Sequence, residues 1–137
     1  MGWVDQPTAA CERWLDTVLR ESACGNAALC VAHVDGEIRG LGTWRRDHEP
    51  ILSHRAEISK VMAHPGAQGM GLGRAATTAL VERARATGLE HLRLRVRGNN
   101  HAAAALYEAL GFHEYARLRT PSPSGTRAST RCGCTSL

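Results

Sequence analysis

The sequence lacks any long hydrophobic run. No apolar stretch approaches the roughly 18–20 residues that a membrane-spanning helix needs, and the first residues carry no signal-peptide pattern. The five cysteines are odd in number and lack the spacing of a disulfide framework or a metal site. These absences predict a cytoplasmic protein with reduced thiols, no membrane association and no bound metal.

Acidic residues are missing from the last eighteen residues, which are rich in Ser, Thr, Pro and Arg. This composition predicts a disordered tail over 120–137, while residues 1–119 are enough for one domain. The net charge of +4 is a weak bias that is compatible with an anionic cofactor. The arginines at 93, 95 and 97 have no interleaved aromatic residues, so we expect a solvated strand face or a contact to a cofactor phosphate, and no nucleic-acid partner.

Helical and strand-like patterns alternate along the rest of the chain. The predicted elements are a helix over 8–21, a hairpin over 27–46 that turns at Asp35-Gly36, a strand over 55–65, a helix between Gly73 and Gly88, a strand over 91–96 and a helix from Asn99 or Asn100 to Gly111. This order predicts an α/β or α+β sheet domain without internal repeats.

Four glycines, Gly66, Gly69, Gly71 and Gly73, lie within eight residues immediately before a predicted helix. The unpaired N–H groups of a helix's first turn attract anions, and glycine lets the backbone approach a phosphate closely. The absence of Gly-Lys-Ser/Thr excludes a nucleoside-triphosphate loop, and the glycine spacing is not that of a dinucleotide fold. Taken alone, the cluster fits either a phosphate site or a flexible loop.

Two motifs favour the phosphate site. The pattern Gln68-x-x-Gly71-x-Gly73, which follows "ISKVMAHP", closely resembles the acyl-CoA signature of the GNAT superfamily of N-acetyltransferases. The segment "NHAAAALYEALGF" (100–112) resembles that superfamily's next patterned helix, with the expected strand in between. The resemblance covers about residues 55–115. It implies a mixed, mostly antiparallel twisted sheet flanked by helices, incomplete at its edges, and acetyl transfer from acetyl-CoA to a primary amine in a ternary complex.

The resemblance also implies which residues hold acetyl-CoA. The strand ending near residue 63 leaves backbone groups unpaired for the pantetheine arm, and the N–H groups of the glycine segment surround the pyrophosphate. Asn100 is either a pantetheine partner or simply a helix cap. The implied cofactor-binding residues are Val61, Met62, Ala63, Gln68, Gly69, Met70, Gly71, Leu72, Gly73, Arg74, Asn100 and Ala103.

Tyr107 is the candidate acid for the departing thiolate, because the family places a tyrosine here; the alternative is a core aromatic. Backbone N–H groups near Met62 or Ala63 would stabilise the oxyanion. Glu57 is the candidate base, and the alternative is an ordinary surface glutamate.

Simple strand alternation places Glu57, Ser59, Val61 and Ala63 on one face, from which the Glu57 carboxylate would reach the amine directly or through water. Neither His54 nor His33 is a favoured base, because isolated histidines more often pack or contact solvent.

The acceptor is expected to be the amine of a small molecule. The stretch "HRAEISKVMAHP" resembles family members that acetylate small amino-acid-like toxins, so a toxin or antibiotic of that kind is the expected type. The alternatives are a protein N-acetyltransferase and a truncated, inactive acyl-CoA-binding domain.

The chain departs from the resemblance at both ends. Family members usually begin with a strand and a helix before the helix at 8–21, and they finish with two strands, the last of which inserts beside the strand at 91–96. A disordered tail would leave 91–96 as an open edge, through which two copies could form a homodimer.

We also hypothesise that the tail is a frameshifted reading of those two final strands. In the shifted frame, the third base of each codon joins the first two bases of the next codon. The Arg131-Cys132 and Gly133-Cys134 junctions then become codons for Leu, Met or Val. The alternative is chance. Every codon with T in its middle position encodes an apolar residue, so a Ser-rich segment that contains cysteines readily yields such codons.

Overall fold

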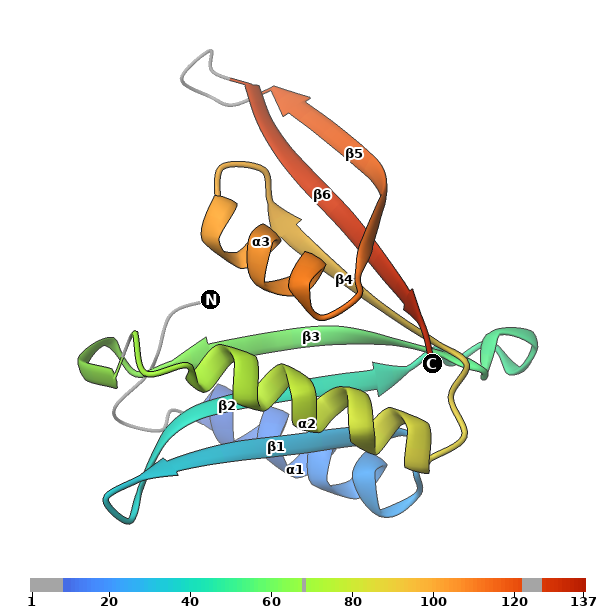
Figure 1. Cartoon of the computed structure of the whole chain (residues 1–137). Helices are drawn as coiled ribbons and strands as arrows, with labels where there is room; N and C mark the ends of the chain where they lie inside the picture. The colour runs from blue at the N-terminus through green and yellow to red at the C-terminus, as the bar shows by residue number, and fades with distance from the viewer. Residues whose placement is uncertain (1–8, 68, 122–126) are drawn as a thin grey trace.

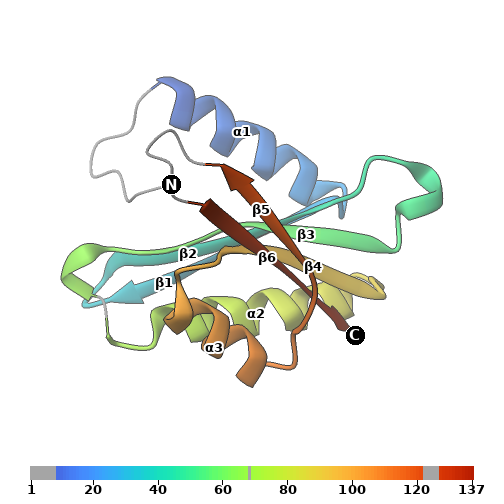
Figure 2. The same ribbon diagram turned by 90° about the horizontal axis from the view of Figure 1, so that it is seen from above.

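The computed structural model describes residues 9–67, 69–121 and 127–137. A twisted six-stranded sheet, with strand order β1-β2-β3-β4-β6-β5, forms its centre. Helix α1 covers one face of the sheet, while α2 and α3 lie on the other (Figures 1 and 2). Neighbouring strands are antiparallel except for β3 and β4, so the predicted mixed, mostly antiparallel fold is confirmed.

The elements follow the predicted order closely. They are α1 (Ala9–Ala23), β1 (Ala27–Val34), β2 (Glu37–Arg46), η1 (Pro50–Leu52), β3 (Arg55–Ala63), η2 (Pro65–Ala67), α2 (Leu72–Ala86), β4 (His91–Arg97), α3 (His101–Ala109), β5 (His113–Pro121) and β6 (Arg127–Ser136).

The main core lies between the sheet and α2. Trp44 of β2 is fully buried, and its indole N–H donates a hydrogen bond of 3.1 Å to the carbonyl of Leu80 in α2. A Cβ atom at Gly42 would lie 2.8 Å from the Leu80 side chain, so glycine allows α2 to approach β2. Replacing Leu80 by alanine would leave a cavity costing about 2–5 kcal/mol.

A β-bulge interrupts the pairing of β2 with β3. Thr43 lies opposite Lys60 and Trp44 lies opposite Ile58, which leaves Ser59 as the extra residue in β3. A bulge of this kind reverses the inward and outward alternation of the side chains that follow it.

The bulge corrects the predicted face of the candidate base. Val61 packs against the core beneath α2, whereas Glu57 pairs with Arg45, whose guanidinium binds Glu21 of α1. Glu57 and Val61 therefore lie on opposite faces, and the alternation predicted from Glu57 to Ala63 is wrong.

The Arg45–Glu21 ion pair ties α1 to the sheet. Two hydrogen bonds of 2.8 and 2.5 Å join the guanidinium to the carboxylate, and this contact lowers the pKa of Glu21. Lys60 adds a second link, because its ammonium lies 4.0 Å from the ring centre of Trp14 in α1.

The final strands correct the disordered-tail prediction. Residues 127–136 form β6, which pairs through residues 130–136 with all of β4 and on its other side with β5. Residues 122–126 lie outside the described part of the chain. Backbone ladders do not require apolar side chains, and Gly133 leaves room for Leu94 and Phe112 beside it. The predicted open edge at 91–96 is therefore wrong, and a homodimer through that edge loses its basis.

Candidate active site

The parallel strands β3 and β4 separate soon after they begin. Their pairing covers only Arg55–Glu57 opposite His91–Arg93, so this ladder ends before Val61 and Met62. A cavity of about 340 Å³ occupies the gap and extends to α3. Its lining includes Val61, Met62, Asn100, Ala103 and Tyr107, which brings together predicted residues from β3 and α3.

Asn100 acts as the cap of α3, since its side-chain oxygen accepts a hydrogen bond of 3.1 Å from the N–H of Ala103. Its amide NH₂ group keeps its donor capacity for a ligand in the cavity. Asn100 can therefore cap the helix and contact a cofactor at once.

Ala63 lies at the end of β3, opposite Gly40, just beyond the cavity-lining Val61 and Met62.

The glycine segment leads into α2 as predicted. Gly69 and Gly71 have φ angles of +84° and +76°, which L side chains rarely adopt. The first intrahelical bond among the described residues runs from the N–H of Ala75 to the carbonyl of Gly71. The N–H groups of Leu72, Gly73 and Arg74 lie in the first turn, where helical N–H groups lack intrahelical partners. These donors and the positive end of the helix dipole form an anion-binding geometry.

The other predicted binding residues of this loop have positions that say less about a binding role. Met70 is exposed and Arg74 lies exposed in the first turn of α2. Gln68 lies outside the described residues. A Cβ atom at Gly73 would lie 3.6 Å from Leu106 of α3, an ordinary contact, so no steric demand of the protein itself requires glycine there.

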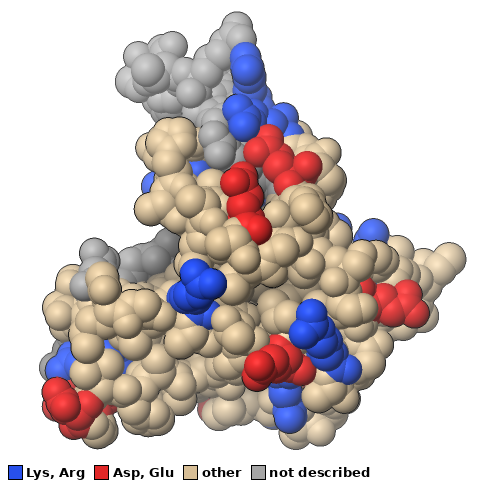
Figure 3. Space-filling model, viewed as in Figure 1, with Lys and Arg blue, Asp and Glu red and all other residues tan. Residues whose placement is uncertain are grey.

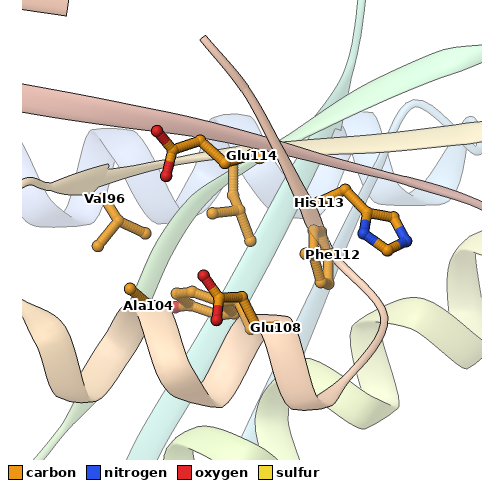
Figure 4. A pocket seen from close by; sticks show the side chains of 9 residues that line it. Val96, Ala104, Glu108, Phe112, His113 and Glu114 are labelled. Carbon is orange, nitrogen blue, oxygen red and sulfur yellow. The ribbon is translucent and has the colours of Figure 1, made fainter. Parts of the chain in front are cut away.

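Tyr107 lies between the cavity and a second, smaller pocket of about 30 Å³ beneath β5. Figure 4 shows this small pocket with Glu108, Phe112 and Glu114 around it. The tyrosine ring meets Phe112 edge to face at 5.8 Å. Burial raises the pKa of the Tyr107 phenol, while a hydrogen bond with Thr77 acts in the opposite direction. The residue is thus both a core aromatic and a wall of the cavity.

Glu57 lies at the closed end of the gap, on the sheet face that carries α1. Its carboxylate forms an ion pair of 3.1 Å with Arg95 of β4. Among the described residues, its neighbour Ile58 lines the cavity while Glu57 does not. The structure therefore brings Tyr107 and the strand residues together and leaves Glu57 at the margin.

Sequence reasoning missed the partners of the β4 arginines. Arg93 donates hydrogen bonds of 3.0 and 3.1 Å to Asp47, which also binds Arg55 at 3.2 Å. Arg95 and Arg97 line the cavity. The alternating arginines were the available signal, but only the fold shows which carboxylates they meet. The face seen in Figure 3 carries both positive and negative side chains.

The comparisons with known proteins agree with this fold. The Acetyltransferase (GNAT) family pattern matches residues 3–112. The chain belongs to the GNAT acetyltransferase family.

Relatives named mycothiol acetyltransferase align with most of the chain. The Beutenbergia cavernae protein is 48% identical over 102 residues, which cover 74% of this chain and 30% of that protein. The Renibacterium salmoninarum protein is 35% identical over 123 residues, covering 88% and 34% respectively. The chain thus spans about a third of the length of these relatives.

Solved structures share the fold at low sequence identity. A Salmonella typhimurium structure described as an acetyltransferase with its cofactor acetyl-CoA has a TM-score of 0.83 and 21% identity, covering 98% of this chain and 78% of that one. A ribosomal-protein-alanine N-acetyltransferase from Brucella melitensis has a TM-score of 0.81 and 23% identity, covering 92% and 76%. Within the described residues, no helix has the length and apolar character needed to cross a membrane.

Proposed function

We propose that this chain transfers an acetyl group from acetyl-CoA to the primary amine of a small molecule, within a ternary complex. The observation that carries the proposal is the cavity between the separated strands β3 and β4, next to the N-terminus of α2. A thioester arm and its diphosphate need these two features side by side.

The cofactor would lie along β3. Its pantetheine amides would pair with the free backbone groups near Val61 and Met62, as an added strand does. Its pyrophosphate would accept hydrogen bonds from the first turn of α2, with the guanidinium of Arg74 adding positive charge. The amide of Asn100 would donate to the pantetheine from the opposite wall.

The chemistry requires one new bond and two proton movements. The amine nitrogen attacks the thioester carbonyl, and backbone N–H groups near Met62 or Ala63 stabilise the oxyanion. The C–S bond then breaks, and Tyr107 donates its proton to the departing thiolate. Glu57 takes a proton from the amine through water, since it lies at the margin of the cavity on the α1 side.

We place the acceptor among small molecules and the reaction in the cytoplasm. The relatives named mycothiol acetyltransferase favour a mycothiol-related amine, alongside the amino-acid-like amines expected from the sequence. Cys24, Cys30 and Cys134 are free thiols, which fits a reducing compartment.

The test combines acetyl-CoA calorimetry with a thiol-release assay over a panel of acceptors. The panel contains a mycothiol-related amine, amino-acid-like amines and peptides with an N-terminal alanine, and acceptor-free samples give the hydrolysis background. The proposal expects binding and release above background with small amines. Release with peptides alone indicates a protein acetyltransferase, and binding without release indicates an inactive acyl-CoA-binding domain. Either of these outcomes would overturn the proposal.

A further inference from the structure

Two histidines and a glutamate converge at the closed end of the β3–β4 pair. His54 directly precedes β3, while Glu90 and His91 stand at the start of β4. Each of the three side chains offers one ligand atom, and these atoms lie within 4.8 Å of one another. The two imidazole rings meet edge to face at 5.9 Å between centroids. The sequence predicted no metal site, and His54 lies far along the chain from the adjacent residues Glu90 and His91.

Backbone hydrogen bonds hold the three residues in place. The carbonyl of His54 accepts from the N–H of Glu90 at 2.8 Å and from that of His91 at 3.2 Å. The carbonyl of Glu90 accepts from the N–H of Leu137 at 2.9 Å. These bonds fix the backbone positions from which the three side chains extend.

One ring nitrogen in this cluster has no hydrogen-bond partner among the described residues. The Nδ1 atom of His91 is buried and forms no hydrogen bond within the described structure. Buried ring nitrogens in folded proteins nearly always have a partner. A cation bound at this nitrogen would supply one.

We propose that His54, Glu90 and His91 bind a divalent transition-metal ion, with Zn²⁺ as the best match. Two imidazoles and one carboxylate are a common zinc donor set, and the fourth position is then open to water. Tetrahedral ligands about 2.1 Å from zinc lie about 3.4 Å apart. With the atoms within 4.8 Å of one another, binding requires them to close by up to about 1.4 Å, which side-chain rotation supplies. Glu90 is exposed, so the ion can enter from solvent.

The ion would act as a structural clamp rather than in acetyl transfer. The cluster is distant from the proposed pantetheine site. Val61 lies six residues beyond Arg55 on β3, so about 20 Å of strand separates that site from the cluster. The cluster lies where the two parallel strands still pair, just before they separate around the cavity. A metal ion there would hold the two strands together at the point from which they diverge.

The experiment titrates Zn²⁺ into the tag-free chain after dialysis against a chelator. Isothermal titration gives affinity and stoichiometry, and thermal unfolding gives the stabilisation. The variants are His54→Gln, Glu90→Gln and His91→Gln, and His33→Gln is the matched control because its imidazole is exposed and distant in the fold. Circular dichroism checks that each variant folds.

We expect one Zn²⁺ per chain and a rise in Tm of several degrees for the parent protein. Each histidine variant should weaken binding by at least about tenfold, whereas His33→Gln should leave it unchanged. X-ray absorption of the bound ion should show two imidazole ligands. If His91→Gln fails to fold, His54→Gln and the exposed Glu90→Gln carry the test. No binding overturns the proposal, and binding that survives both of these substitutions shows an adventitious ion only and overturns it as well.

Discussion

Tyr107 illustrates how one residue can pack in the core and also line a cavity. Its ring packs against Phe112, while its side chain also lines the cavity between β3 and α3. Burial raises the pKa of its phenol above the ordinary value. The proton that an acid must donate is therefore retained across neutral and moderately alkaline pH.

Tyr107→Phe tests the proposed acid without removing the ring. We expect turnover to fall by roughly 10²-fold, as is usual for loss of a general acid, while calorimetry shows nearly unchanged acetyl-CoA affinity. Because the pKa is raised, the alkaline loss of activity that depends on Tyr107 should begin only above about pH 10. Tyr115→Phe, at an exposed position of β5, is the control. Unchanged turnover in Tyr107→Phe contradicts the assignment.

Glu57→Gln tests the proposed base. The Glu57–Arg95 pair is largely exposed, so its loss should affect stability little. We expect turnover at neutral pH to fall by roughly 10²-fold with unchanged thermal unfolding. Glu82→Gln, on the exposed surface of α2, provides the comparison. Equal rates for the two variants would assign Glu57 to the surface role instead.

At the scale of elements, the sequence predicted the glycine segment before α2 but not the bulge in β3. The segment's role as the entry to α2 followed from neighbouring residues, because positive φ angles and helix starts are local properties. The bulge at Ser59 depends on how β2 pairs with β3, and no local pattern indicated it. For that reason the glycines were placed correctly while the face of Glu57 was not.

Gly73→Val separates a phosphate-binding role from a conformational one. Gly73 has no positive φ angle and has ordinary space for a Cβ atom, so the fold should persist. A branched side chain there would block close approach of a diphosphate, and we expect acetyl-CoA affinity to fall by more than about tenfold, or 1.4 kcal/mol. Calorimetry measures this, with Thr78→Val on the exposed side of α2 as control. Affinity within about threefold of the parent protein argues against the phosphate role.

For the whole molecule, β6 is the decisive element. It lies between β4 and β5, and it converts what would be an open edge into the interior of the sheet. The frameshift hypothesis for this segment stays a prediction. A stop codon in the alternative frame before the codon of residue 134 would contradict it.

Ending the chain at Pro121 tests the contribution of β6. We expect Tm to fall by at least about 10 °C, since the backbone ladders to β4 and β5 are lost. The exposed edge of β4 should then cause self-association, which light scattering after size exclusion detects. Leu118→Ser changes an exposed side chain of β5 and is the control. A truncated chain with an unchanged Tm and monomeric mass would show that β6 contributes little.

The sequence by itself determined the features that depend on residues close together in the chain. Asn100 caps α3, Gly71 precedes α2, and the two motifs alone indicate the family. Short-range hydrogen bonds and backbone preferences fix such features, so a local pattern suffices to predict them.

Only the tertiary structure decided what depends on pairing between distant segments. The bulge that separates the faces of Glu57 and Val61 arises from the register between β2 and β3. The insertion of β6 rests on backbone ladders, which carry no side-chain signature. His54 meets His91 because β3 and β4 begin side by side. Composition and periodicity do not encode these long-range contacts, since each depends on which strands pair and in which register.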